Sequence, residues 1–463
     1  MGIPQLLGFS VLLALGPGVA QAAPAVAGAL PLWWGLPFAL LLLSIALGPM
    51  LFGHLWHRGM AFFALGFVLS LLLPWAALHG AGAALGMVWH SLLLEYLPFV
   101  ALIFALFSTG SGIVVQGGPW GTPAGNTALL AIGTVLASLM GTTGAAMVLI
   151  HPLLRANAHR RRKVHVVVFF ILLVANVGGS LTPLGDPPLF MGFLRGVPFF
   201  WPTLNLLPPM ALVAGLLLAV FWLLDRRLSR HDPPPPERLP LRLKGRANIG
   251  LLAAIVAVVL MQGVWQPGEV DILGQHIGLQ GLLGMLLLVV IGLISLRITP
   301  QANREANLFS WAPFQEVAIL FAAIFITMAP VVAMLRQGMA GPFAPLLALT
   351  AGADGAPDPV AYFWLTGALS AFLDNAPTYL VFFEMAGGDP ARLTGEFSRS
   401  LVAISCGAVF MGAITYIGNA PNFMVRAVAE HRGVRMPGFI GYMGWSLLFL
   451  VPVLLLVTLV FFA

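Results

Sequence analysis

The sequence predicts an all-α polytopic membrane protein that consists of two inverted-topology repeats with broken helices and re-entrant hairpins. Composition is the first observation: 59% of the 463 residues are hydrophobic and only 8% are charged. This is too little charge to cover the surface of a soluble protein. At roughly 20 residues for each crossing, the chain has room for about 10 to 13 membrane segments. The second observation is a sequence repeat, and the third is the placement of the basic loops.

The repeat is visible in residues 176–190 and 410–424, where glycine and proline prevent a continuous helix. The matching pairs share one offset (412 − 179 = 233) and are Gly179 and Gly412, Thr182 and Thr415, Gly185 and Gly418, Pro188 and Pro421, and Met191 and Met424. The same offset relates Gly141-Thr-Thr-Gly144 to Asp374-Asn-Ala-Pro377, and a looser one relates Glu95 to Glu316. Constant spacing across separate motifs indicates an internal duplication.

Four segments follow one another along the chain. Residues 1–23 are either a signal-like segment or a first membrane helix, because an apolar core and a small-residue cleavage motif are present without an N-terminal Lys or Arg. Residues 24–224 form the first repeat, and residues 248–463 form the second. Between them, residues 225–247 form a linker rich in proline and arginine, which we expect to be cytoplasmic and semi-rigid.

Each repeat is expected to contain three spans, a hairpin, a broken span and a final span. In the first repeat these are residues 34–52, 60–78, 88–116, 125–157, 164–200 and 205–224. In the second they are residues 248–266, 279–297, 312–334, 359–386, 400–431 and 438–462. The two hairpin segments are predicted from a polar tip in the middle of an apolar run. Alternatively, residues 125–157 form one tilted helix.

Basic loops orient the two repeats. Residues 155–163 and 225–246 concentrate Arg and Lys and are expected in the cytoplasm, so a hairpin at 125–157 opens to the cytoplasmic side. The hairpin at 359–386 is flanked by acidic or mixed loops and opens to the opposite side. Opposed repeats with broken helices are typical of secondary transporters, whose binding site lies near the membrane midplane. The net charge of +6 is explained by these loops rather than by nucleic-acid binding.

Polar residues at the breaks are the candidate ion- and substrate-binding groups. A broken helix leaves carbonyl groups unpaired at one end and N–H groups at the other, which suit Na⁺ and anions respectively. The candidates are Thr142, Thr143, Ser180, Thr182, Gly185 and Asp186 in the first repeat, and Asp374, Asn375, Thr415, Gly418 and Asn419 in the second. Alternatively, the Ser, Thr and Gly residues serve only close helix packing.

Asp186 and Asp374 are the strongest candidates, because each carboxylate lies beside helix-breaking residues in a hydrophobic region. A buried carboxylate can exchange its proton for a cation. Together with Asn375, the two aspartates are the expected Na⁺ ligands, since hard oxygen ligands suit Na⁺ better than soft metals. Alternatively, each aspartate caps the half-helix that follows it. No resident cofactor is expected; Na⁺ and H⁺ are expected as transported or coupling ions.

Other charged residues allow more than one interpretation. Arg195 and Arg426 follow the broken stretches at similar distances. They are either partners of an anionic substrate or of the aspartates, or anchors at the membrane surface, which we favour. Glu95 and Glu316 are either functional or interfacial, and Glu384 is expected at the far aqueous side.

At these motifs the chain resembles the ion transporter superfamily, which includes divalent-anion/sodium symporters, arsenite efflux proteins and NhaD-type sodium/proton antiporters. Residues 178–190, 314–321 and 373–378 are most similar to the NhaD-type and citrate-transport-like branches, and the resemblance covers residues 30–463. It implies a scaffold part and a transport part in each half, elevator-like movement of the transport part, and a homodimer. We expect an integral protein of a bacterial inner (cytoplasmic) membrane, whose partners are the lipid bilayer and a small ion.

One departure from the superfamily bears on the substrate. Its dicarboxylate symporters carry Ser-Asn-Thr at both hairpin tips, whereas the tips here read Gly141-Thr-Thr and Asp374-Asn-Ala. An aspartate at a tip repels a polycarboxylate and favours a cation. The first hypothesis is therefore an antiporter that exchanges Na⁺ or Li⁺ for H⁺ through Asp186 and Asp374. The alternative is a Na⁺- or H⁺-coupled transporter of citrate or another small anion. The sequence has no protease-type or hydrolase-type motif, so an enzyme is not expected.

Overall fold

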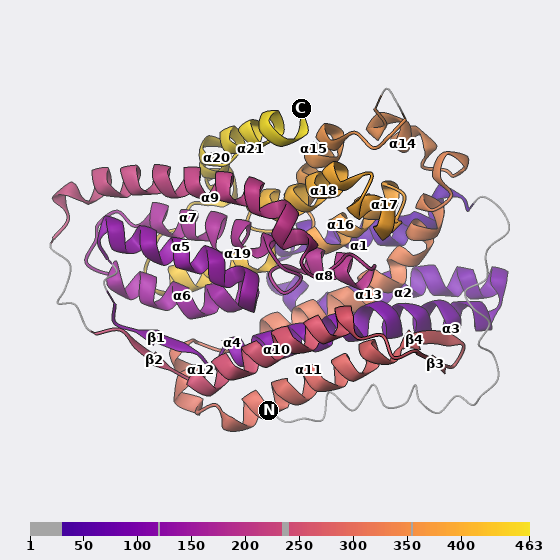
Figure 1. Cartoon of the computed structure of the whole chain (residues 1–463), viewed down its shortest axis with the longest axis horizontal. Coiled ribbons are helices and arrows are strands. Elements are labelled where there is room, and N and C mark those ends of the chain that lie inside the picture. The colour runs from indigo at the N-terminus through magenta and orange to yellow at the C-terminus, as the bar shows by residue number, and fades with distance from the viewer. Residues whose placement is uncertain (1–29, 119–120, 234–239, 353–354) are drawn as a thin grey trace.

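The computed structural model describes residues 30–118, 121–233, 240–352 and 355–463, so the expectation for residues 1–23 lies outside the described residues (Figure 1). Within these ranges, nine helical runs are long and apolar enough to cross a membrane. This confirms a mostly helical, polytopic membrane protein in contact with the bilayer. The apolar segments Val164–Ser180 and Ser398–Met411 are shorter because they belong to interrupted spans. The predicted total of about 10 to 13 segments came from chain length alone and does not distinguish these short segments from full spans.

The first helix group joins the beginnings of the two halves of the chain, residues 36–110 and 246–335. It contains α1 (Leu36–Leu51), α2 (His54–His79), α3 (Ala81–His90), the π-helical η4 (Ser91–Tyr96), α4 (Leu97–Gly110), α10 (Arg246–Val264), α11 (Leu279–Ile298), α12 (Gln301–Ala306) and α13 (Ala312–Leu335). α11 packs along α4 and α10, and α13 packs on α1 and α2 (Figure 1). Large apolar side chains such as Phe62 and Leu286 point outward, as expected of helices that face lipid.

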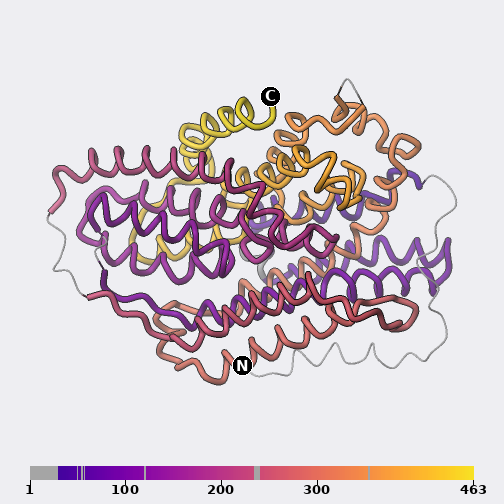
Figure 2. The backbone as a smooth tube through the Cα atoms, viewed as in Figure 1, coloured from indigo at the N-terminus to yellow at the C-terminus, as the bar shows by residue number. Residues whose placement is uncertain are grey.

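The second helix group joins residues 123–228 with residues 359–462. It contains α5 (Pro123–Met140), α6 (Thr142–Ala156), α7 (Val164–Leu173), η5 (Val177–Ser180), α8 (Pro187–Leu194), α9 (Trp201–Leu228), α15 (Pro359–Ser370), α16 (Asn375–Met385), α17 (Pro390–Thr394), α18 (Ser398–Met411), α19 (Ala420–His431), α20 (Phe439–Phe449), α21 (Val451–Val457) and η8 (Thr458–Phe462). α16 packs on α8, α19 on α6 and α7, and α18 on α9, so the two halves of the chain interleave (Figure 2).

Short elements connect these helices. They are η3 (Leu32–Gly35), η6 (Ser229–His231), η7 (Gly338–Ala340), α14 (Ala344–Thr350), β1 (Val114–Gln116), β2 (Arg242–Lys244), β3 (Glu269–Ile272) and β4 (Gln275–Gly278). β1 pairs with β2, and β3 with β4, both antiparallel. The all-α prediction is therefore wrong in these places. The strands are too short to show an alternating pattern, and β1 pairs with a distant part of the linker.

Several helix starts follow local signals in the sequence. The Thr122 hydroxyl accepts the N–H of Gly125 at 3.0 Å, and Pro123 occupies the first position of α5. The Asp358 carboxylate accepts the N–H of Val360 at 3.0 Å at the start of α15. These caps satisfy N–H groups that have no partner within the helix.

Asp225, near the end of α9, is a fully buried anchor for the basic loop at residues 155–163. Its carboxylate contacts the Arg160 guanidinium, lies 2.8 Å from His165 Nε2, and accepts the side-chain N–H of Asn126 at 3.1 Å. Arg160 is itself only 4% exposed and also donates to the carbonyl of Gly121. The basic loop is therefore fixed to α5 and α9, which the run of arginines in the sequence did not reveal.

We expect Asp225→Asn to lower the stability of the folded protein by about 3 kcal/mol or more, because the buried Arg160 loses its counter-charge. The measurement is the thermal unfolding of the purified protein in detergent, compared with Glu396→Gln. Glu396 forms an exposed pair with Arg392, and such pairs contribute about 0 to 1 kcal/mol. Equal melting temperatures for the two variants would show that the Asp225 contacts do not stabilise the fold.

Candidate ion- and substrate-binding site

The helices are broken at each of the four predicted interruptions. α5 ends at Met140 and α6 begins at Thr142, with Gly141 between them at φ +81°, a conformation that glycine adopts without strain. α15 ends at Ser370 and α16 begins at Asn375. A loop that contains the short η5 separates α7 from α8, and a second loop separates α18 from α19.

The loops before α8 and α19 contain matching hydrogen bonds. The Thr182 hydroxyl donates to the carbonyl of Ser138, and the Thr415 hydroxyl donates to the carbonyl of Ala371, with a separation of 44 residues in each case. In both loops the hydroxyl also accepts a backbone N–H from two residues further on, at 3.2 Å. These threonines thus fasten each loop to the end of α5 or α15.

Glycines allow the same loops to fold closely on themselves. A Cβ at Gly185 would collide with the carbonyl oxygen of Gly179, and a Cβ at Gly418 would lie 2.6 Å from that of Gly412. The carbonyl of Gly185 also accepts the N–H of Thr142 at 2.8 Å. The start of α6 is therefore held against the loop that leads into α8.

Asp186 lies where four helices begin, and it is only 2% exposed. Thr142 Oγ1 and Asn419 Nδ2 donate to its Oδ1 at 2.9 Å and 3.2 Å, and Asn375 Nδ2 donates to its Oδ2. Asp186 is the N-cap residue of α8, while its three partners lie at the first positions of α6 and α16 and at the N-cap of α19. The positively polarised N-termini of four helices therefore surround one carboxylate.

Two further asparagines support this arrangement from behind. Asn419 Nδ2 donates to Asn176 Oδ1 at 3.2 Å, and Asn176 Nδ2 donates to Asn422 Oδ1 at 2.7 Å. Asn422 Nδ2 in turn donates to the carbonyls of Gly412 and Thr415 at 2.8 Å and 2.9 Å. Asn176 and Asn422 are not among the binding residues predicted from the sequence. Their amides within the two broken apolar stretches were the signal that could have identified them.

The Asp374 side chain makes a different contact. Its carboxylate accepts the N–H of Ala376 at 3.0 Å and so caps α16. The capping alternative therefore holds for Asp374, whereas the Asp186 side chain makes no such bond to the start of α8. The two aspartates are not equivalent, because only Asp186 binds side chains from the other half of the chain.

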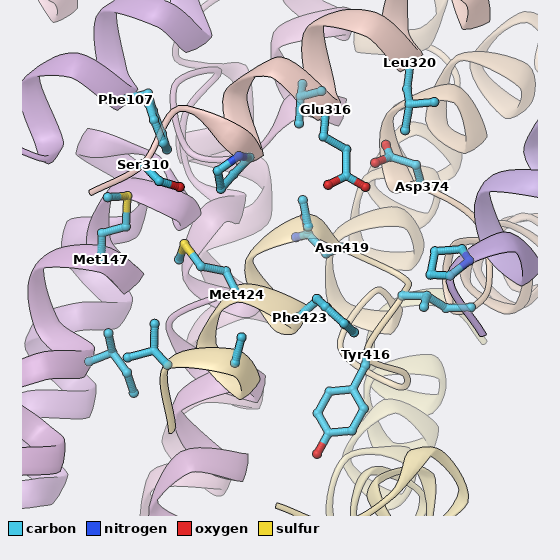
Figure 3. A pocket seen from close by; sticks show the side chains of 18 of the residues that line it. Phe107, Met147, Ser310, Glu316, Leu320, Asp374, Tyr416, Asn419, Phe423 and Met424 are labelled. Atoms are coloured by element: carbon cyan, nitrogen blue, oxygen red, sulfur yellow. The ribbon is translucent and has the colours of Figure 1, made fainter. Parts of the chain in front are cut away.

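Two adjoining cavities lie beside these residues. The smaller has a volume of 90 Å³, and its polar lining residues are Thr142, Thr143, Asp186, Asp374 and Asn419. The larger, of 340 Å³, lies between the two helix groups, among α1, α4, α13, α6 and α19. Figure 3 shows the carboxylates of Glu316 and Asp374 turned toward each other in this cavity, close to Asn419. Among the described lining residues of either cavity there is no Lys or Arg.

The structure brings together only part of the predicted set. Thr142, Thr143, Gly185, Asp186, Asp374 and Asn419 line the cavities, and Asn375 contacts Asp186 directly. Ser180, Thr182, Thr415 and Gly418 lie outside both linings. The Ser180 hydroxyl bonds within its own loop, whereas the Thr182 and Thr415 hydroxyls bond to the ends of α5 and α15. In these positions the three hydroxyls stabilise the loop structure.

A separate ion-pair network joins the two helix groups. Arg195, which follows α8, contacts Glu95 in η4 and lies 2.6 Å from Glu384 in α16. Arg336, at the end of α13, lies 2.9 Å from the same Glu384 carboxylate, which is fully buried. None of these four residues lines either cavity.

Two predictions about charged residues are therefore wrong. Glu384 does not face water, and Arg195 is neither a surface anchor nor a residue of the cavities, because both are paired with residues distant in sequence. Glu95 and Glu316 also occupy different environments, since Glu95 belongs to the ion-pair network and Glu316 lines the larger cavity. Arg426 pairs with Glu430 one helical turn away, at 2.9 Å.

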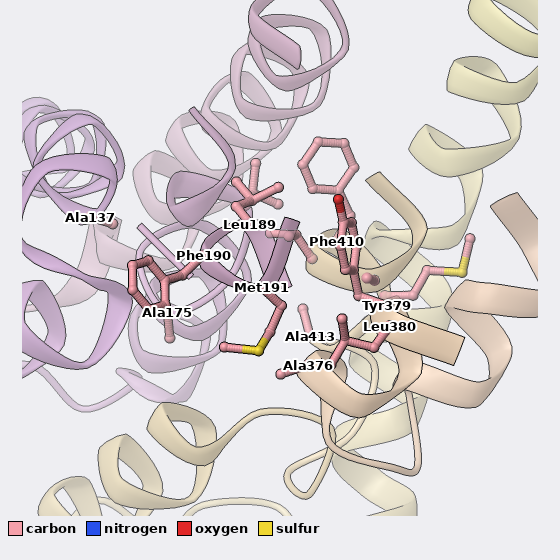
Figure 4. Close-up of a cluster of buried hydrophobic side chains, with 14 of the residues drawn as sticks. Ala137, Ala175, Leu189, Phe190, Met191, Ala376, Tyr379, Leu380, Phe410 and Ala413 are labelled. Atoms are coloured by element: carbon pink, nitrogen blue, oxygen red, sulfur yellow. The ribbon is translucent and has the colours of Figure 1, made fainter. Parts of the chain in front are cut away.

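Apolar side chains hold α8 against α16 and α18. In Figure 4, Leu189 and Met191 of α8 lie beside Tyr379 and Leu380 of α16, with Phe410 of α18 above them. All five side chains are buried. Because α8 and α16 come from different halves of the chain, this packing keeps the N-termini of the two helices together.

A family model described as "Putative citrate transport" matches residues 27–462, nearly the whole chain. The chain belongs to this citrate-transport family. The match confirms the resemblance to the ion transporter superfamily. It also confirms that the protein is a membrane transporter and not an enzyme. No curated protein shows significant similarity to the chain.

We expect Glu384→Gln to destabilise the protein by about 1 to 3 kcal/mol, because Arg195 keeps only Glu95 as a partner and Arg336, which is 58% exposed, loses its contact with Glu384. Thermal unfolding in detergent measures this change, with Glu430→Gln as the control on an exposed pair. If Glu384→Gln unfolds at the wild-type temperature, the network contributes nothing to the association of the two helix groups.

Proposed function

We propose that the protein is a cation-coupled secondary transporter of citrate or another small carboxylate anion. The observation that carries the proposal is the meeting of four helix N-termini at Asp186, beside a cavity between the two helix groups. N-terminal N–H groups bind carboxylates, and a buried acid binds the coupling cation. Membership of the citrate-transport family supports this function better than cation/proton antiport.

Charge explains how the cation and the anion would be coupled. With Asp186 ionised, and with Asp374 and Glu316 nearby, the cavity repels a polycarboxylate. H⁺ or Na⁺ at Asp186 removes one negative charge, after which the helix N-termini favour the anion. Each ligand then strengthens the binding of the other, as thermodynamic linkage requires.

The proposed cation site is centred on Asp186 and Asn375. In the described part of the chain, the buried Oδ1 of Asn375 has no hydrogen-bond partner, although Nδ2 of the same side chain contacts Asp186. A carboxylate and an amide oxygen are ligands that suit Na⁺, and Asp374 lines the adjoining cavity as a third candidate. The proton is the other possible coupling ion.

We further propose that the two halves are inverted repeats that give alternating access through elevator-like movement. The matching Thr182 and Thr415 contacts support a repeat, as does the 233-residue offset between Asp186 and its partner Asn419. The position of the larger cavity between the two helix groups supports movement of one group against the other. We also propose that the protein forms a homodimer in a bacterial inner membrane.

A second candidate function is the exchange of Na⁺ or Li⁺ for H⁺. The observation that favours it is the acidic lining of the larger cavity, where Glu316 and Asp374 face each other without a Lys or Arg among the described lining residues. Such a lining suits a cation as the transported species.

Uptake of radiolabelled citrate into liposomes that contain the full-length chain tests the first function. An inward Na⁺ or H⁺ gradient should drive uptake in wild type and in Glu396→Gln, whose side chain is exposed. Asp186→Asn should reduce gradient-driven uptake about 5- to 150-fold, the usual range for a lost coupling between two ligands. Wild-type coupling in Asp186→Asn would show that the cation binds elsewhere.

Proton flux in the same liposomes separates the two functions. For an anion carrier, Asp374→Asn should retain at least part of the citrate uptake, and Na⁺ or Li⁺ alone should move no protons. For an antiporter, Na⁺ or Li⁺ should release protons from acid-loaded liposomes without citrate, and Asp374→Asn should abolish that release. Cation-triggered proton flux with no citrate uptake would replace the first function with the second.

A further inference from the structure

A third cavity, with a volume of 500 Å³, lies where two basic loops meet the ends of membrane helices. Its lining residues are Arg161, Arg162, Lys163, Val164, His165, Leu228, Gly433, Val434, Arg435 and Trp445. It shares none of them with the two cavities beside Asp186. Nothing in the proposed transport reaction uses this cavity.

The lining carries a concentrated positive charge. The cations are Arg161, Arg162 and Lys163 from the loop before α7, and Arg435 from the loop before α20. In the ranges that the structure describes, no ion pair engages any of these four side chains. The neighbouring Asp232 carboxylate accepts the backbone N–H of Arg161 at 3.2 Å and forms no ion pair with another described residue. The cavity therefore attracts anions.

Apolar surface continues from the same cavity. Leu228 at the end of α9 and Trp445 on α20 form part of its wall. Leu448 lies one turn beyond Trp445 on α20 and is 66% exposed, and Leu224 lies one turn before Leu228 on α9 and is partly exposed. Exposed leucines on membrane helices face lipid chains, and tryptophan is favoured at the level of the lipid headgroups.

We propose that this cavity binds the headgroup phosphate of an acidic phospholipid. The four cations would contact the phosphate, and the acyl chains would extend along the exposed apolar faces of α9 and α20. A soluble anion would use the cations alone, whereas a phospholipid uses both the charge and the adjoining apolar surface. Basic pockets between membrane helices on the cytoplasmic side suit anionic headgroups in this way.

Lipid titration of the purified full-length protein in detergent tests this inference, with thermal unfolding as the readout. Phosphatidylglycerol should raise the melting temperature at lower concentration than phosphatidylcholine. The double variant Arg161→Gln/Arg435→Gln removes one cation from each loop, and it should bind phosphatidylglycerol about 30-fold more weakly, at about fivefold for each cation. Arg297→Gln is the matched control, an exposed arginine at the end of α11.

Three outcomes would overturn the proposal: wild-type affinity for phosphatidylglycerol in the double variant, equal effects of the two lipids, or an equal effect of inorganic phosphate. The last outcome would identify a site for soluble anions. A measurement on wild type alone covers the case in which the double variant does not fold. Raising the salt concentration from about 0.05 to 0.5 M should weaken phosphatidylglycerol binding and leave phosphatidylcholine unaffected, because only the first depends on charge. Binding that does not change with salt would contradict the inference.

Discussion

The burial of one carboxylate, Asp186, is the constraint on which the arrangement of the second helix group depends. An ionised side chain inside a membrane protein is costly unless it is hydrogen-bonded and its charge is balanced. Among the described residues, no arginine or lysine contacts Asp186. Thr142, Asn375 and Asn419 donate to the carboxylate, and four helices begin around it. Four helices can begin around Asp186 only if the helical spans are broken at this point. The helix breaks and the buried carboxylate therefore depend on each other.

The breaks are in turn maintained by the backbone around them. Gly141 adopts a positive φ, Gly185 lies against a carbonyl, and Thr182 and Thr415 use their hydroxyls to hold the loops. Exposed carbonyls at membrane depth need such partners, because no lipid group can supply a hydrogen bond. Thr182, Thr415 and Gly185, which are predicted binding residues, therefore also hold the loops in place.

The negative charge of the cavities is difficult to reconcile with an anionic substrate. A carrier of citrate, the proposed substrate, has to accept a polyanion, yet the polar lining consists of carboxylates, amides, hydroxyls and the His151 imidazole, with no Lys or Arg among the described residues. In the proposed function, a coupling cation at Asp186 would neutralise one of these negative charges when the anion binds. The proposed coupling therefore follows from the electrostatics of the lining and not from a fixed cationic partner such as Arg195.

The sequence by itself determined the polytopic class, the positions of the helix breaks and the importance of Asp186, because hydropathy, Gly/Pro content and a lone acid in an apolar stretch are local properties. Tertiary structure decided what each polar side chain contacts. Asn419 binds Asp186 across 233 residues, Arg195 binds Glu384 across 189, and β1 pairs with the distant β2. It also decided that α7 lies inside the protein and not against lipid. A uniformly apolar helix is compatible with lipid and with the protein interior, and a charged side chain does not specify its partner. Only the long-range packing of the chain decides where such a helix lies and which partner such a side chain contacts.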